Sequence, residues 1–70
     1  MIYRLTIYLN DKDGIESKEI GEFDTWEKAT DELIKITTEG YKYQTDRKDA
    51  SSDYWFYPPS SIVKYHIFSK

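Results

Sequence analysis

Residues 2–9, IYRLTIYL, form the most regular pattern in this sequence and decide its fold. Large side chains at Tyr3, Leu5, Ile7 and Leu9 alternate with Arg4, Thr6 and Tyr8. Successive side chains of a β-strand point to opposite faces of the sheet, so this alternation predicts a strand with one buried face.

A second strand is expected to return beside the first. Residues 10–14 read NDKDG, a cluster of turn formers in which Gly14 can adopt a positive φ. Residues 15–23 should therefore pair antiparallel with the first strand. The apolar residues Ile15 and Phe23 stand at odd positions, but Ile20, just before Gly21, stands at an even one. In a regular strand Ile20 would therefore point to the opposite face, so a β-bulge is predicted at that point.

A helix is predicted over residues 26–38. Thr25 can accept a hydrogen bond from an orphan amide at the start of the helix, and Gly40 can end it with a positive φ. Apolar side chains recur at helical spacing opposite a charged face, namely Trp26, Ala29, Leu33 and Ile36. The sequence therefore predicts an amphipathic helix that covers one face of a sheet.

Three further strands are expected at residues 41–45, 54–57 and 62–68. The connection at residues 46–53 contains no large apolar side chain and predicts an exposed, mobile hairpin tip. Pro58 and Pro59 cannot donate to a sheet ladder, so the fourth strand must end before them.

The resulting order, strand, strand, helix and three strands, predicts one α+β domain over residues 1–70. We expect a two-layer arrangement in which an antiparallel sheet of about five strands carries the helix on one face, with sequence neighbours paired as hairpins. The alternative is a small curled β-barrel plugged by the helix.

Composition argues against catalysis and metal binding. The chain has no cysteine and a single histidine, His66, and it contains no Gly-rich phosphate loop or catalytic motif. Thiolate zinc sites, disulfides and histidine-rich metal sites are therefore excluded. We expect a protein that is not an enzyme and that needs no cofactor, metal or small-molecule substrate.

The aromatic run Tyr54-Trp55-Phe56-Tyr57 is the most unusual local feature. Alternation along a strand places two of these rings on each face, and a two-layer core can bury only one pair. Exposed Trp and Tyr are enriched in protein interfaces. The predicted binding residues are Trp55 and Tyr57, as the outward pair, with Arg47 and Lys48 nearby. The alternative is that the helix covers one pair and a neighbouring chain or a long side chain covers the other.

These residues predict a small protein–protein interaction module that binds another protein, or itself as a homodimer, through a sheet edge and exposed aromatic rings. A chain of this size has a marginal core that a dimer interface would stabilise. The alternative function is weak binding of single-stranded nucleic acid, because residues 41–70 have net charge +2 and hold most of the rings. The acidic pI of about 5.0 argues against strong binding of this kind.

The first residues lack a basic segment followed by an apolar run, and no stretch approaches the ~20 apolar residues of a membrane span. We therefore expect a cytoplasmic protein that does not bind membranes. Small size and a Lys- and Tyr-rich composition are typical of accessory and regulatory proteins of Gram-positive bacteria and their phages.

Overall fold

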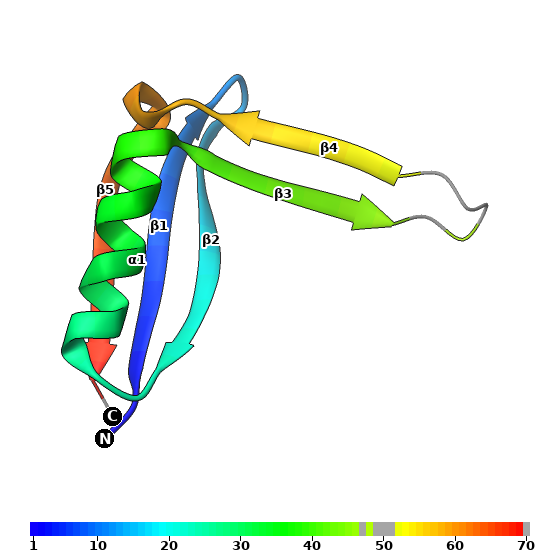
Figure 1. Cartoon of the computed structure of the whole chain (residues 1–70). Helices are drawn as coiled ribbons and strands as arrows, with labels where there is room; N and C mark the ends of the chain where they lie inside the picture. Colours follow the sequence, from blue (N-terminus) through cyan, green and yellow to red (C-terminus); the bar gives the residue numbers. More distant parts are fainter. Residues whose placement is uncertain (47, 49–51, 70) are drawn as a thin grey trace.

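A computed structural model describes residues 1–46, 48 and 52–69 of this 70-residue chain (Figure 1). It contains five strands, one α-helix and a short 3-10 helix, η1. In chain order the elements are β1 (Tyr3–Asp11), β2 (Gly14–Phe23), α1 (Trp26–Glu39), β3 (Tyr41–Asp46), β4 (Ser52–Tyr57), η1 (Pro59–Ser61) and β5 (Ile62–Ser69).

The core lies between α1 and a three-stranded sheet in the order β2-β1-β5. The side chains of Leu5, Ile7 and Leu9 on the central strand are fully buried, as their alternation predicted. From the helix, Ala29, Leu33 and Ile36 are buried on the facing side. Burial of these side chains supplies the hydrophobic stabilisation of the two layers.

The predicted bulge is confirmed and lies at Ile20. Leu5 pairs with Gly21 and Thr6 pairs with Glu19, which leaves Ile20 without a partner on β1. The extra residue turns Ile20 toward the core, against which it packs. Residues three apart in a regular strand point to opposite faces of the sheet. Because of the bulge, the side chains of Glu19 and Glu22 instead point to the same face.

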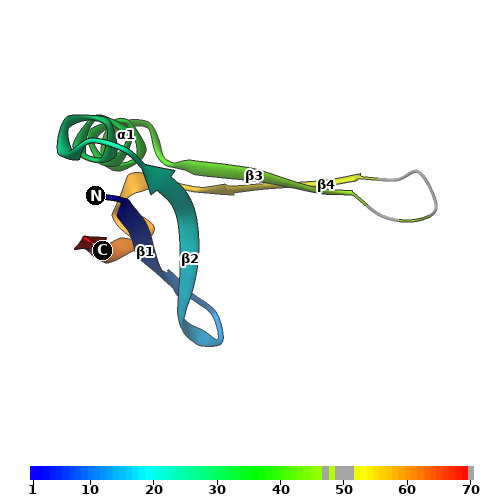
Figure 2. The same ribbon diagram turned by 90° about the horizontal axis from the view of Figure 1, so that it is seen from below.

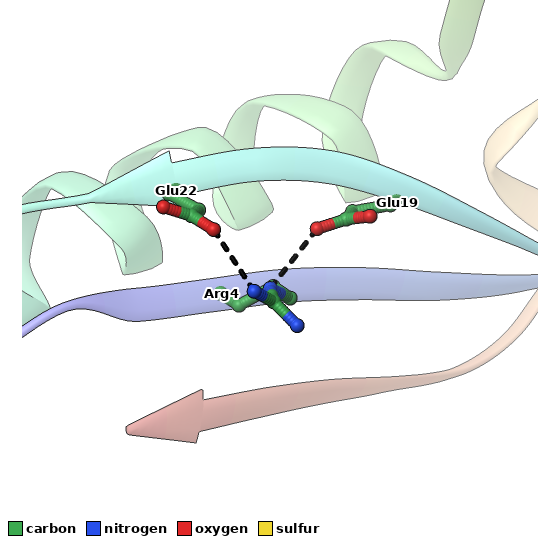
Figure 3. Close-up of polar contacts among 3 residues, drawn as sticks. All are labelled: Arg4, Glu19 and Glu22. Carbon is green, nitrogen blue, oxygen red and sulfur yellow. Dashed lines mark hydrogen bonds and ion pairs between the residues drawn. The ribbon is translucent and has the colours of Figure 1, made fainter. Parts of the chain in front are cut away.

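Arg4 on β1 binds both of these carboxylates, one on each side of the bulge (Figure 3). Its guanidinium lies 3.0 Å from Glu19 Oε1 and 3.0 Å from Glu22 Oε1. The hydrogen bond to Glu22 and the charges of both carboxylates raise the pKa of Arg4. Because these groups are exposed, the contacts contribute more to the register of the bulge than to stability.

The helix begins at the predicted residue, Trp26, and ends at Glu39, one residue beyond the predicted end and directly before the predicted cap Gly40. The hydroxyl of Thr25 accepts a hydrogen bond from the backbone N–H of Lys28 at 3.2 Å. At the other end, the N–H of Gly40 donates to the carbonyl of Ile36 at 2.8 Å, and Gly40 adopts a φ of 94°. Among the described residues, no helix combines the length and the apolar character that crossing a bilayer requires.

The α+β class is confirmed, but the expected single sheet of about five strands is wrong. The strands form two antiparallel sheets, one of three strands and one that contains only β3 and β4. The last strand pairs with β1 rather than with β4, because the turn at η1 returns the chain along the body. The three-stranded sheet is not a closed barrel, so the barrel alternative is also wrong.

Candidate protein-binding arm

Strands β3 and β4 form a two-stranded arm that projects from the body, and we call this pair of strands the arm (Figure 1). A view from a perpendicular direction shows the same projection beyond β2 (Figure 2). Only the base of the arm reaches the core, where Tyr41 and Tyr57 pack against the buried cluster. Of the expected tip, residues 46–53, the ends belong to the strands, because β3 extends to Asp46 and β4 begins at Ser52, and residues 47 and 49–51 lie outside the described residues.

One face of the arm is a ladder of stacked rings, Tyr41, Tyr43, Trp55 and Tyr57, which we call the aromatic ladder. The register pairs Tyr41 with Tyr57 and Tyr43 with Trp55 across the two strands. Tyr43 is central, with its ring centroid 5.6 Å from that of Tyr41 and 6.3 Å from those of Trp55 and Tyr57. Offset stacking of this kind stabilises cross-strand pairs beyond the burial of their area.

Lys18 connects the aromatic ladder to the three-stranded sheet. Its ammonium lies 4.7 Å from the centroid of the Tyr43 ring and 2.9 Å from Glu16 Oε1. The hydrogen bond to Glu16 raises the pKa of Lys18, and the neighbouring Tyr43 adds to this effect. Lys18 pairs with Ile7, whose side chain lies beneath α1, so the ladder faces the helix-covered side of the sheet.

The opposite face of the arm carries Lys42, Gln44, Tyr54 and Phe56, and we call it the open face. Lys42 pairs with Phe56 and Gln44 with Tyr54. The Tyr54 side chain is 77% exposed and that of Phe56 is 55% exposed, compared with 49% for Trp55 on the other face. These residues, with Tyr43 and Trp55, line an open hollow of about 420 Å³. Lys42 Nζ lies 5.9 Å from the Phe56 ring and adds a positive charge to this apolar surface.

The structure places the predicted binding residues at different depths. Trp55 is half-exposed at the outer end of the ladder, whereas Tyr57 is partly buried against the core. Lys48 lies exposed in the turn at the tip. Arg47 is outside the described residues. The arm therefore brings Trp55 and Tyr57 onto one face, and their neighbours Tyr54 and Phe56 on the other face have the larger exposed fractions.

Sequence reasoning did not select Lys18, Lys42, Tyr54 or Phe56 as site residues. The strand alternation identifies two pairs of rings but does not say which pair the body covers. Lys18 is distant from Tyr43 in sequence, and no local pattern predicts their contact. A hairpin register between residues 41–46 and 52–57 would have placed Lys42 beside Phe56.

The arm offers ring surfaces and a cation rather than a reactive group. His66 lies on the exposed face of β5, and its ring centroid is 6.4 Å from that of Phe68. Within residues 1–46, 48 and 52–69, no three acidic or histidine side chains gather as metal ligands. The arrangement can bury apolar surface, stack on a flat group and pair with a negative charge.

Comparison of the chain with protein-family models, curated proteins and solved structures produced no match.

Proposed function

We propose that this protein is a non-enzymatic protein–protein interaction module and that the arm is its binding element. The observation that carries this proposal is the exposure of Tyr54 and Phe56 on the open face of an arm that projects from the body. Aromatic side chains on a preformed strand bury a large area and lose few rotamers on binding. The proposal includes a cytoplasmic location and an accessory or regulatory role.

Stability supports the same conclusion. An isolated two-stranded hairpin is marginally stable in water, and only the base of this arm packs on a core. A partner that covered the open face would bury Tyr54 and Phe56 and would also stabilise the arm itself. In the described part of the chain, β3 and β4 have only each other as strand neighbours, so an additional strand can be added beside this sheet.

Site-specific photocrosslinking tests the proposal. A tagged protein with benzoyl-phenylalanine at position 54 is irradiated in a lysate of its own host, and a matched protein carries the probe at Ile15, which is 64% exposed at the opposite hairpin. We expect a protein adduct from position 54 that Phe56→Lys abolishes, and no such adduct from position 15. Equal labelling from both positions, or no adduct from position 54, would contradict the proposal.

Single-stranded nucleic acid is the second candidate, and the position of Lys42 beside Phe56 favours it. A base could stack on the ring while the ammonium met a phosphate. The net charge of −3 limits this attraction. Titration of a labelled oligonucleotide over a salt series tests the idea, because phosphate binding must weaken steeply with salt. Absence of binding near 50 mM salt removes this candidate.

A further inference from the structure

We propose that the open face of the arm binds the outer surface of α1 in a second copy of this chain, so that two copies exchange arms around a twofold axis. The inference rests on the proposed function, since it names the partner of the arm. It follows from the composition of the helix, the direction in which both surfaces face, and the area that they can bury.

The outer surface of α1 carries a stripe of four residues at helical spacing, Glu27, Asp31, Ile34 and Thr38, which we call the outer stripe. It lies on the side of the helix opposite the buried Leu33 and its neighbours. All four side chains are exposed, and Ile34 is 60% exposed despite its apolar character. The stripe thus combines one uncovered apolar side chain with two carboxylates, and the exposed Lys35 lies beside it on the flank of the helix.

The open face has the complementary composition. Tyr54 and Phe56 provide apolar surface and Lys42 provides a positive charge. One strand spacing of about 4.8 Å separates Lys42 from Phe56. Asp31 and Ile34 are separated along the helix axis by about 4.5 Å. The Ile34 side chain of one copy can therefore pack between the rings of Tyr54 and Phe56 of the other copy. In the same position, the Asp31 carboxylate can form an ion pair with the Lys42 ammonium.

The open face and the outer stripe point to the same side of the molecule. A twofold dimer in which each arm binds the other helix requires this, because both surfaces must face the partner. The ladder side of the arm faces the sheet, because Lys18 of β2 lies over Tyr43. The open face is on the other side of the arm and faces away from the sheet. The outer stripe also faces away from the sheet, because α1 buries its opposite side against β1. Two copies can therefore meet through these sides, each arm over the other helix.

The arm does not cover the outer stripe of its own helix. It starts directly after Gly40 at the end of α1 and projects away from the body (Figure 1). Its own open face therefore approaches α1 only at the base, where Lys42 and Glu39 line a shared hollow. Contact between Tyr54 and Ile34 has to form between two molecules.

The buried area favours two contacts over one. Tyr54 and Phe56 are 77% and 55% exposed, so one open face can bury on the order of 200–300 Å². Counting the helix side as well, a single arm-on-helix contact removes on the order of 500 Å², too little for a specific interface. The twofold exchange doubles this area to on the order of 1,000 Å², which is near the lower limit for such interfaces.

A charge-swap experiment tests this arrangement. Lys42→Glu and Asp31→Lys each place like charges at both contacts of the dimer, so each variant alone should have a dimer dissociation constant at least about tenfold above that of the parent. An equimolar mixture of the two variants contains dimers in which one contact is swapped and the other is native. We expect dimers to return in the mixture, as measured by sedimentation velocity between 10 and about 500 μM.

Matched variants separate the interface from folding. Ile34→Glu and Tyr54→Glu should weaken dimerisation, whereas Ile15→Glu and Lys12→Glu, at the β1–β2 turn, should leave it unchanged. Far-UV circular dichroism and a urea midpoint near that of the parent are required of each variant. If Asp31→Lys fails to fold, Ile34→Glu and Tyr54→Glu test the helix side and the arm side of the same contact.

Three results would overturn the inference. They are a parent that stays monomeric at 500 μM, a dimer that Ile34→Glu leaves intact, and a mixture of the two charge variants that stays monomeric. None of these contradicts the proposed function, which the crosslink at position 54 to a different protein would still support. A loss of oligonucleotide binding in Tyr54→Glu, with a monomeric parent, would instead assign the open face to nucleic acid.

Discussion

Gly40 and the ring of Phe56 lie so close together that a methyl group on Gly40 would come within 2.7 Å of Phe56 Cε1. The same methyl group would also come within 2.7 Å of the carbonyl oxygen of Tyr57. The junction between α1 and the arm therefore requires a residue without a side chain. Its φ of 94° and ψ of 172° place Gly40 in a region that other residues rarely adopt.

Gly40→Ala should lower the free energy of unfolding by more than about 2 kcal/mol, because it combines backbone strain with a clash against the arm. Gly14→Ala is the matched control. Gly14 also has a positive φ, 117°, but a methyl group there meets no atom within 4 Å. Urea unfolding of both variants measures the difference, and equal losses would show that the contact with Phe56 does not constrain the arm.

Leu33→Ala should cost about 2–5 kcal/mol of stability, because Leu33 is 8% exposed in the core and its truncation leaves a cavity. The adjacent Ile34 is 60% exposed, so Ile34→Ala should change stability by less than about 0.5 kcal/mol. Both values come from urea unfolding at low protein concentration, where association does not contribute. A small loss for Leu33→Ala would mean that this side of α1 does not face the sheet.

The contact between Lys18 and Tyr43 should be visible by NMR. With the Lys18 ammonium 4.7 Å from the ring centroid, the ε-methylene protons of Lys18 should be shifted upfield by the ring current. Tyr43→Leu should return these protons to the position of an exposed lysine such as Lys12. An unshifted Lys18 resonance in the parent would show that the arm does not lie against β2 in solution.

Alkaline pH should destabilise the protein through Tyr41. Burial raises the pKa of the Tyr41 phenol above its ordinary value of 10.0, so folding favours the neutral form. This contribution is fully present below pH 10 and is lost as the pH rises through the higher folded-state pKa. The urea midpoint of the parent should fall above about pH 10.

Tyr41→Phe removes this titration, so the midpoint of that variant should fall less steeply over the same range of pH. Tyr54→Phe, at a ring that is 77% exposed, controls for the loss of a hydroxyl group. Identical slopes for the parent and Tyr41→Phe would place Tyr41 in solvent rather than against the core.

Local patterns in the sequence predicted the five strands and the α-helix, but not the 3-10 helix η1. Alternation at Leu5, Ile7 and Leu9 predicted the central strand, and the cap at Thr25 predicted the start of the helix. The parity change before Gly21 predicted the bulge. These features depend on residues that are close in the chain, so propensity, capping and periodicity are sufficient to identify them.

Only the tertiary structure decided which strands pair and which rings are covered. Alternation assigns a side chain to a face, but it does not identify the neighbouring strand. Strand β5 pairs with β1 because burial of Ile62 and Ile67 against the core favours that position, which leaves β3 and β4 as a separate arm. The contact of Lys18 with Tyr43 and the exposure of Tyr54 follow from this long-range arrangement, and residue order alone does not contain it.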